Sequence, residues 1–169
     1  MKRGKILTAF ILAFTLLIAV SATAQEKATP EEVFAKVKEA AAYLAEKGDA
    51  ALAEFNDPKG PWVWKDTYIF VYDCDVGICV GNPNNTNIVG TKIEEIVDIN
   101  GNPVGIPLCE LSKKPNGGWM EYMWKVMGSD EHKKKISFIY KAPGAKYTVG
   151  AGIYGPEGVT LEELNKGLE

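Results

Sequence analysis

Arginine and histidine are nearly absent from this 169-residue chain. Arg3 is the one arginine, and His132 is the one histidine, placed among acidic residues and lysines. Beyond residue 3, an anion must therefore be held by lysine, backbone N–H or hydroxyl groups, because no guanidinium fork exists. This argues against a protein whose function is to bind phosphate or nucleotides. A single histidine without paired cysteine spacing also gives no support for a zinc site.

The sequence also lacks the patterns of catalytic and metal-binding proteins. It has no Gly-x-Ser-x-Gly motif, and its one histidine stands in the most polar run of the chain. Two segments begin like calcium loops, at Asp73 and Asp98, but neither supplies glutamate at the twelfth position. We therefore predict no catalytic residues, no metal and no cofactor.

The first 24 residues have the three-part pattern of a secretory signal peptide. Three basic residues precede an apolar run over residues 6–20, and small residues follow it at 22–24. We predict cleavage after Ala24, so that the mature chain begins at Gln25 and is periplasmic or secreted. An uncleaved membrane anchor is the alternative for this segment.

The remaining chain, residues 25–169, has the length of one domain. The whole sequence has 19 lysine and arginine residues, of which three lie in the signal, so 16 remain against 22 acidic residues. This acidic balance argues against a nucleic-acid partner. We find no second apolar segment of membrane length in the sequence, so we expect no stable membrane span after cleavage.

The most informative stretch of the chain is residues 62–83. An unbroken aromatic and β-branched run at residues 68–72 predicts a buried central strand. Turn-forming residues at 73–77 separate it from a second apolar run at residues 78–80. The stretch is therefore most simply a β-hairpin.

Three cysteines, Cys74, Cys79 and Cys109, permit one disulfide in an exported chain. A two-residue turn centred on Val76 and Gly77 would place Cys74 directly opposite Cys79. A bridge there would close a small loop and contribute about 2 kcal/mol of stability. A longer turn would break this register, Cys109 is a rival partner for either cysteine, and three buried free thiols are the further alternative.

The rest of the chain predicts an α+β domain. Thr29, followed by Pro30 and by Glu32, begins a long helix with a capping box, and apolar residues recur along it at helical spacing. The later segments predict a short helix at 106–113, strands at 119–126, 135–141 and 146–154, and a short helix after Thr160. We expect the long N-terminal helix to pack on one face of a five-stranded antiparallel sheet, leaving the other face for a pocket.

Aromatic residues and one lysine are the candidates for that pocket. Aromatic residues are concentrated at 62–72 and again at 119–124. Each one alone is most simply a core residue, but together they are more than one face of the sheet needs for its core. Tyrosine and tryptophan combine an apolar body with a polar tip, which suits a pocket for a small polar molecule. Lys135 either ends a solvated run of three lysines or points inward at the start of a strand.

Six motifs occur along the chain in this order: Gly-Pro-Trp at 60–62, Tyr-x-Phe-x-Tyr-Asp at 68–73, Asn-Pro at 82–83, Gly-Trp-x-Glu-Tyr-x-Trp at 118–124, Lys-x-Ser at 135–137 and Val-Gly-x-Gly-Ile-Tyr at 149–154. From about Pro30 to Tyr154 the chain resembles the single Cache domain, type 2, of bacterial extracytoplasmic sensors. The resemblance implies a long helix behind a five-stranded antiparallel, PAS-like sheet. It also implies a pocket on the opposite face for small ligands, often short carboxylates.

Together the aromatic pattern and this resemblance give seven candidate ligand-binding residues: Trp62, Tyr68, Phe70, Asn82, Tyr122, Trp124 and Lys135. The family commonly has His-Pro where this chain has Asn82-Pro83. Its members usually sit between two membrane helices ahead of a kinase or chemotaxis module, and this sequence has neither the second helix nor the module.

We therefore expect a non-catalytic, stand-alone sensory domain that binds a short organic acid or similar metabolite. It would signal through a separate membrane receptor or kinase partner. The competing interpretation is an accessory or structural module whose pocket is vestigial.

Overall fold

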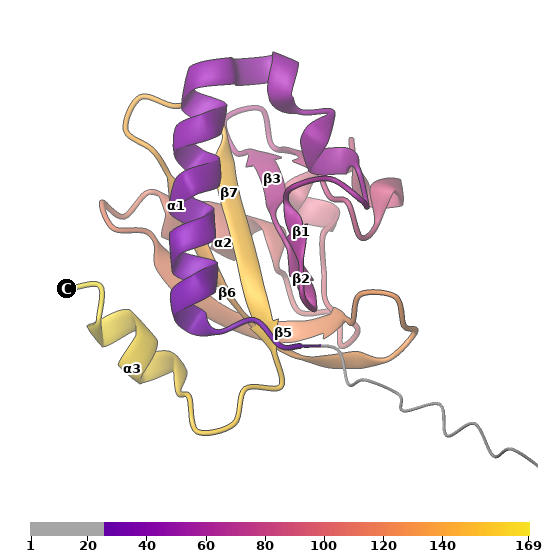
Figure 1. Ribbon diagram of the computed structural model, residues 1–169, viewed down its shortest axis with the longest axis vertical. Helices are drawn as coiled ribbons and strands as arrows, with labels where there is room; N and C mark the ends of the chain where they lie inside the picture. The colour runs from indigo at the N-terminus through magenta and orange to yellow at the C-terminus, as the bar shows by residue number, and fades with distance from the viewer. Residues whose placement is uncertain (1–25) are drawn as a thin grey trace, which may run out of the picture.

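The computed structural model describes residues 26–169 (Figure 1). The predicted signal peptide lies outside the described residues, so its cleavage remains a prediction. Within residues 26–169, no helix combines the length and the apolar character needed to cross a membrane. The elements in chain order are α1 (Pro30–Lys47), η1 (Gly48–Ala51), η2 (Glu54–Asn56), β1 (Val63–Trp64), β2 (Thr67–Tyr68), β3 (Phe70–Asp73), β4 (Ile78–Gly81), η3 (Thr86–Ile88), η4 (Ile93–Glu95), α2 (Gly105–Ser112), β5 (Gly118–Lys125), β6 (His132–Lys141), β7 (Thr148–Tyr154) and α3 (Leu161–Lys166).

The predicted capping box starts α1. The Thr29 hydroxyl accepts the Glu32 N–H at 3.3 Å, and the Glu32 carboxylate accepts the Thr29 N–H at 3.0 Å. Val33, Val37 and Leu44 are among the residues that this helix buries against the sheet. The start and the inward face of the first helix therefore follow from its sequence, but α1 ends at Lys47, before Gly48, and the apolar residues after it lie in η1 and η2 rather than in a continued helix.

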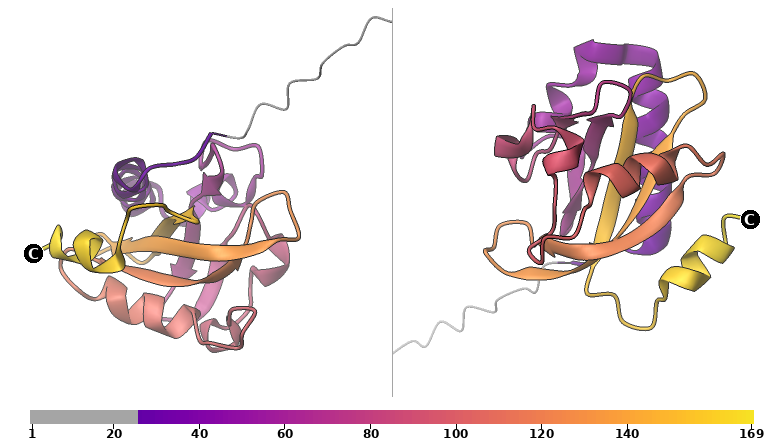
Figure 2. Two further views of the ribbon diagram at one scale, coloured as in Figure 1. Left: turned by 90° about the horizontal axis from the view of Figure 1, so that it is seen from below. Right: turned by 180° about the vertical axis from the view of Figure 1, so that it is seen from behind.

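The main sheet has five antiparallel strands in the order β4-β3-β7-β6-β5, which confirms the predicted fold class. The helix α1 covers one face and the shorter α2 lies on the other (Figure 2). Strand β7 is buried along its whole length because it is central in the sheet and lies under α1. Two cores result, one beneath α1 and one on the α2 face.

The C-terminal helix α3 attaches to the outer edge of β5. The Asn165 side chain accepts the Trp119 N–H at 2.9 Å and donates to the Trp119 carbonyl at 3.1 Å. The amide thus occupies both outward-facing backbone groups of one edge residue, as a neighbouring strand would. This contact holds α3 beside the sheet.

The start of β6 differs from the prediction. We expected this strand to begin at residue 135, after the polar run that contains His132, but β6 begins at His132 and pairs that residue with Lys125. The β5–β6 ladder therefore extends three residues further than the apolar pattern indicates. Lys133 and Lys134 are exposed in this extension, so these charged residues do not form the apolar pattern that predicts a strand.

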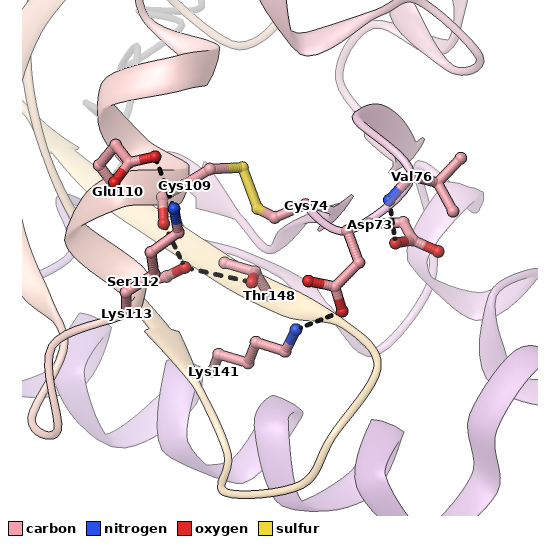
Figure 3. Close-up of a disulfide and its surroundings, with 10 residues drawn as sticks. Asp73, Cys74, Val76, Cys109, Glu110, Ser112, Lys113, Lys141 and Thr148 are labelled. Carbon is pink, nitrogen blue, oxygen red and sulfur yellow. Dashed lines mark hydrogen bonds and ion pairs between the residues drawn. A yellow bond between two sulfur atoms is a disulfide. The ribbon is translucent and has the colours of Figure 1, made fainter.

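The disulfide also differs from the prediction. Cys74 is bonded to Cys109, with a Cα–Cα distance of 5.7 Å, and the expected Cys74–Cys79 pairing is wrong (Figure 3). The β3–β4 turn has four residues between the paired Asp73 and Ile78, so Cys79 lies opposite Tyr72 instead. The bridge joins this turn to α2.

The third cysteine is free, and a hydrogen bond lies close to the disulfide. Cys79 is a buried free thiol, and burial raises its pKa to about 12. Close to the disulfide, the Ser112 hydroxyl of α2 lies 3.3 Å from the Thr148 hydroxyl of β7 (Figure 3). A covalent bond therefore ties α2 to the β3–β4 turn, and a hydrogen bond ties it to β7.

Candidate functional site

The most unusual buried group on the α2 face of the sheet is the side chain of Lys135. It is fully buried, and its Nζ lies 4.3 Å from the ring centroid of Tyr68, 4.8 Å from that of Tyr154 and 5.6 Å from that of Phe70. No hydrogen-bond partner of Nζ is found among residues 26–169. We call these four residues the lysine cage.

Strand register explains why Lys135 points inward. In the antiparallel sheet, Lys135 of β6 pairs with Tyr122 of β5 and with Tyr154 of β7, and paired residues project from the same face. The next residue, Ile136, belongs to the core beneath α1, as the two-residue alternation of a strand requires. The lysine therefore faces the α2 side, where the cage forms.

Gly152 of β7 makes room for the lysine. It pairs with Ser137, and a Cβ atom built on it would collide with Ser137 Oγ and would lie 2.8 Å from Lys135 Cε. Contacts this short force neighbouring atoms to move. A glycine at this position is therefore a condition for the observed path of the Lys135 side chain.

We expect Gly152→Ala to lower the free energy of unfolding by about 1 to 3 kcal/mol, because the added methyl group overpacks the cage. Urea unfolding measures the change. Gly167→Ala is the matched control, since a Cβ there would meet its nearest neighbour at 3.6 Å. Equal stability of Gly152→Ala and the parent protein would show that the cage has room to spare.

The Tyr68 hydroxyl connects the cage to a surface pocket. It accepts hydrogen bonds from Trp124 Nε1 at 3.1 Å and from Asn84 Nδ2 at 3.5 Å. These two donors occupy its acceptor sites, and the hydroxyl also interacts with Tyr154 and Lys135 of the cage. Trp124 and Asn84 also line a pocket of about 270 Å³. Their hydrogen bonds to the Tyr68 hydroxyl therefore link the lining of this pocket to the lysine cage.

Burial and the positive charge of the lysine set the electrostatics of the site. Burial lowers the pKa of Lys135, and the nearby Tyr68 and Asp66 partly offset this effect. Burial raises the pKa values of Tyr122 and Tyr154. It also disfavours the Tyr68 phenolate, but the Lys135 ammonium and hydrogen bonds to the hydroxyl outweigh it, so the pKa of Tyr68 is lowered. The cage thus favours an added negative charge beside the lysine.

The sequence model of the Cache domain family matches residues 59–157. This chain belongs to the Cache domain family. No curated protein matches it.

Three solved structures share the fold of this Cache domain. A methyl-accepting chemotaxis protein from Vibrio parahaemolyticus has 19% identity and a TM-score of 0.59, with 73% of this chain and 86% of that chain covered. A Cache chemosensory domain, solved in a study of carboxylic acid recognition, has 22% identity and a TM-score of 0.56, with 73% and 86% covered. A periplasmic sensor domain of a chemotaxis protein has 22% identity and a TM-score of 0.56, with 73% and 88% covered. At these identities the likeness establishes the fold.

Five of the seven candidate residues come together in this Cache domain. Tyr68, Phe70 and Lys135 belong to the lysine cage, and Trp124 donates to the Tyr68 hydroxyl. The Tyr122 ring meets Trp124 edge-on at 5.5 Å, and its hydroxyl lies 2.9 Å from the Ser137 hydroxyl. These five form one contiguous group on the α2 face.

The other two candidates lie elsewhere in the Cache domain. Trp62 stacks on Phe55 at 4.7 Å in the core beneath α1, on the opposite side of the sheet. The Asn82 side chain accepts the Asn85 N–H at 2.9 Å and so shapes the loop after β4. The structure does not bring either side chain together with the lysine cage.

Sequence reasoning omitted two residues of the site, Tyr154 and Asn84. Tyr154 ends the last motif of the family resemblance, but its position opposite Lys135 depends on the exact β6–β7 register. Asn84 lies in an asparagine-rich loop, where no local pattern distinguishes one amide from the next. Only the folded arrangement places its Nδ2 beside Tyr68.

Proposed function

We propose that this Cache domain is an exported sensory domain that binds a short carboxylate or a similar small organic acid at the lysine cage. The observation that carries the proposal is the buried Lys135 Nζ, for which no hydrogen-bond partner is found within residues 26–169. A buried charged group ordinarily has a partner, because desolvation without one is costly. A ligand carboxylate would supply it.

The donors at the site suit a carboxylate. The Lys135 ammonium can donate charge-assisted hydrogen bonds, and the Tyr68 hydroxyl proton is a second, neutral donor. The surrounding rings exclude water, which strengthens both interactions. One structure with the same fold comes from a study of carboxylic acid recognition by a Cache chemosensory domain, in line with this ligand class.

The proposed cellular role is to report ligand status to another protein. We assign residues 25–169 to one periplasmic or secreted domain, released from a signal peptide after Ala24. The similar folds belong to chemotaxis proteins, one of them described as a periplasmic sensor domain. A separate membrane receptor or kinase would then receive the signal.

Native mass spectrometry of protein from the periplasmic fraction of its own host tests the proposal. We expect a mass that begins at Gln25 with a small acid retained, and a rise in melting temperature with carboxylates but not with the matching amides. Intact Met1 in the membrane fraction would contradict export. An empty protein without a thermal shift across a carboxylate panel would instead favour the accessory module with a vestigial pocket.

A further inference from the structure

Lys135 differs from the lysines beside it on β6 because the protein gives it no anion. Lys133 forms an ion pair with Glu131 at 3.1 Å, and Lys134 forms one with Glu121 at 3.3 Å, both with exposed side chains. Lys135 is buried, and no hydrogen-bond partner of its Nζ is found in the described part of the chain. What surrounds its Nζ is aromatic.

The titratable groups that face Lys135 do not replace the missing anion. Tyr122 from β5 and Tyr154 from β7 are kept neutral by burial, which raises both pKa values. Tyr68 from β2 presents its ring to Nζ, with the centroid at 4.3 Å, and although its own pKa is lowered, it offsets only part of the effect of burial on the pKa of Lys135. Asp66, in the turn between β1 and β2, accepts the Ala28 N–H at 2.8 Å and forms no ion pair with Lys135. An ammonium group at this position is surrounded by aromatic rings, where an ordinary lysine would contact water or a carboxylate.

Ring faces attract a cation, but they compensate only part of its lost hydration. Burial accordingly lowers the pKa of Lys135 in the ligand-free protein. A carboxylate that enters the cage reverses the balance, because an opposite charge at close range favours the protonated amine. The ligand and the proton therefore each favour the binding of the other.

We infer that the lysine cage binds a carboxylate together with one proton, so that the domain responds to the concentration of the uncharged acid rather than to that of its anion. In this step the neutral Lys135 amine takes up one proton from solution, one N–H bond forms, and an ammonium–carboxylate pair results. No bond of the ligand changes. The inference rests on the proposed function and adds its coupling to pH.

The sign of the coupling follows from linkage. The bound-state pKa of Lys135 lies above the free-state pKa, so proton uptake occurs in the pH window between them. Within this window the dissociation constant for the anion rises by up to about tenfold for each pH unit. Because the product of anion and proton concentrations is proportional to the acid concentration, occupancy follows the acid.

Calorimetric titration of acetate, propionate and pyruvate tests the inference. Each is titrated at matched pH in two non-anionic buffers of different ionisation enthalpy that both buffer at that pH, from about pH 6 to about pH 9, a range that spans the neutral region below the ordinary lysine pKa. The dependence of the observed heat on the ionisation enthalpy of the buffer gives the number of protons taken up. We expect a value that approaches one, and Lys134→Met, on the same strand, should keep it.

The outcomes separate the two proposals. Binding without proton uptake at every pH would overturn this inference and leave the proposed function standing. Absence of binding by all three carboxylates, at every pH, would overturn the proposed function and this inference with it.

A second measurement needs no ligand and compares the free energy of unfolding of Lys135→Met with that of the parent. Because the folded-state pKa of Lys135 is depressed, the unfolded chain binds more protons between the two pKa values. The parent should lose stability relative to Lys135→Met as the pH falls from about 10.4, the ordinary lysine pKa, and the difference should level off below the folded-state pKa. A difference that stays constant from about pH 6 to about pH 10.4 would overturn the inference.

Discussion

Lys135→Ala is expected to weaken carboxylate binding by about thirty-fold to several thousand-fold, the equivalent of about 2 to 5 kcal/mol. The variant removes the one cationic group of the cage and leaves the ligand carboxylate buried with the Tyr68 hydroxyl as its remaining donor. Calorimetric titration of a carboxylate that shifts the melting temperature measures the loss. Lys135→Met keeps most of the side-chain volume and should lose affinity to a similar degree.

The matched control is Lys133→Ala, two residues away on the same strand. Its ammonium pairs with Glu131 at the surface, where an ion pair contributes little, so affinity should be unchanged. Melting curves of all variants show whether a loss of binding reflects a loss of folding. Equal affinities for the parent, Lys133→Ala and Lys135→Ala would place the ligand outside the cage.

Cys109→Ser is expected to lower the free energy of unfolding by about 3 to 4 kcal/mol. The Cys74–Cys109 bridge joins residues 35 apart in the sequence, and closing a loop of this length reduces the entropy of the unfolded chain. This is more than the short loop of a Cys74–Cys79 bridge would provide. The substitution also frees α2 from the β3–β4 turn and leaves the Ser112–Thr148 hydrogen bond as a polar tie to β7.

Urea unfolding of the oxidised and the reduced protein provides the measurement. A reductant should destabilise the parent by a similar amount and have no effect on Cys109→Ser. Cys79→Ala serves as a control, because it removes the buried free thiol and keeps the bridge, and it should remain sensitive to the reductant. A peptide map with Cys74 joined to Cys79 would contradict the assignment.

The places of the helices and of most strands along the chain could be predicted because their signals are local. The capping boxes at Thr29 and Thr160 begin α1 and α3, and both are present in the structure. The apolar runs likewise located strands, but the run at 68–72, expected to be one central strand, is divided between β2 and β3, and β7 is the central strand of the sheet. Such signals depend on residues that are close in sequence, so no tertiary contact is needed to interpret them.

The pairing register could not be predicted, because it depends on turn length. The shortest turn would set Cys74 opposite Cys79, but the actual turn is two residues longer and sets Tyr72 there. The β6–β7 connection behaves in the same way. A two-residue turn at 143–144 would pair Lys135 with Gly152, whereas the observed loop pairs it with Tyr154.

The site was predictable in part for the same reason. Alternation along β5 and β6 places Tyr122, Trp124 and Lys135 on one face once the strands are located. Trp62 precedes the main ladder, so no alternation rule fixed its side, and it lies beneath α1. Which residues complete the cage depends on contacts between distant strands.

The contact between α3 and β5 also bears on how copies of the protein behave toward one another. An open edge strand offers backbone groups on which another chain can extend the sheet. On β5, Asn165 occupies both groups of Trp119, and Asp98 accepts the Met123 N–H at 3.4 Å. Side chains thus interrupt the row of backbone groups that this edge could offer to a foreign strand. Aggregation by sheet extension is thereby opposed along this edge.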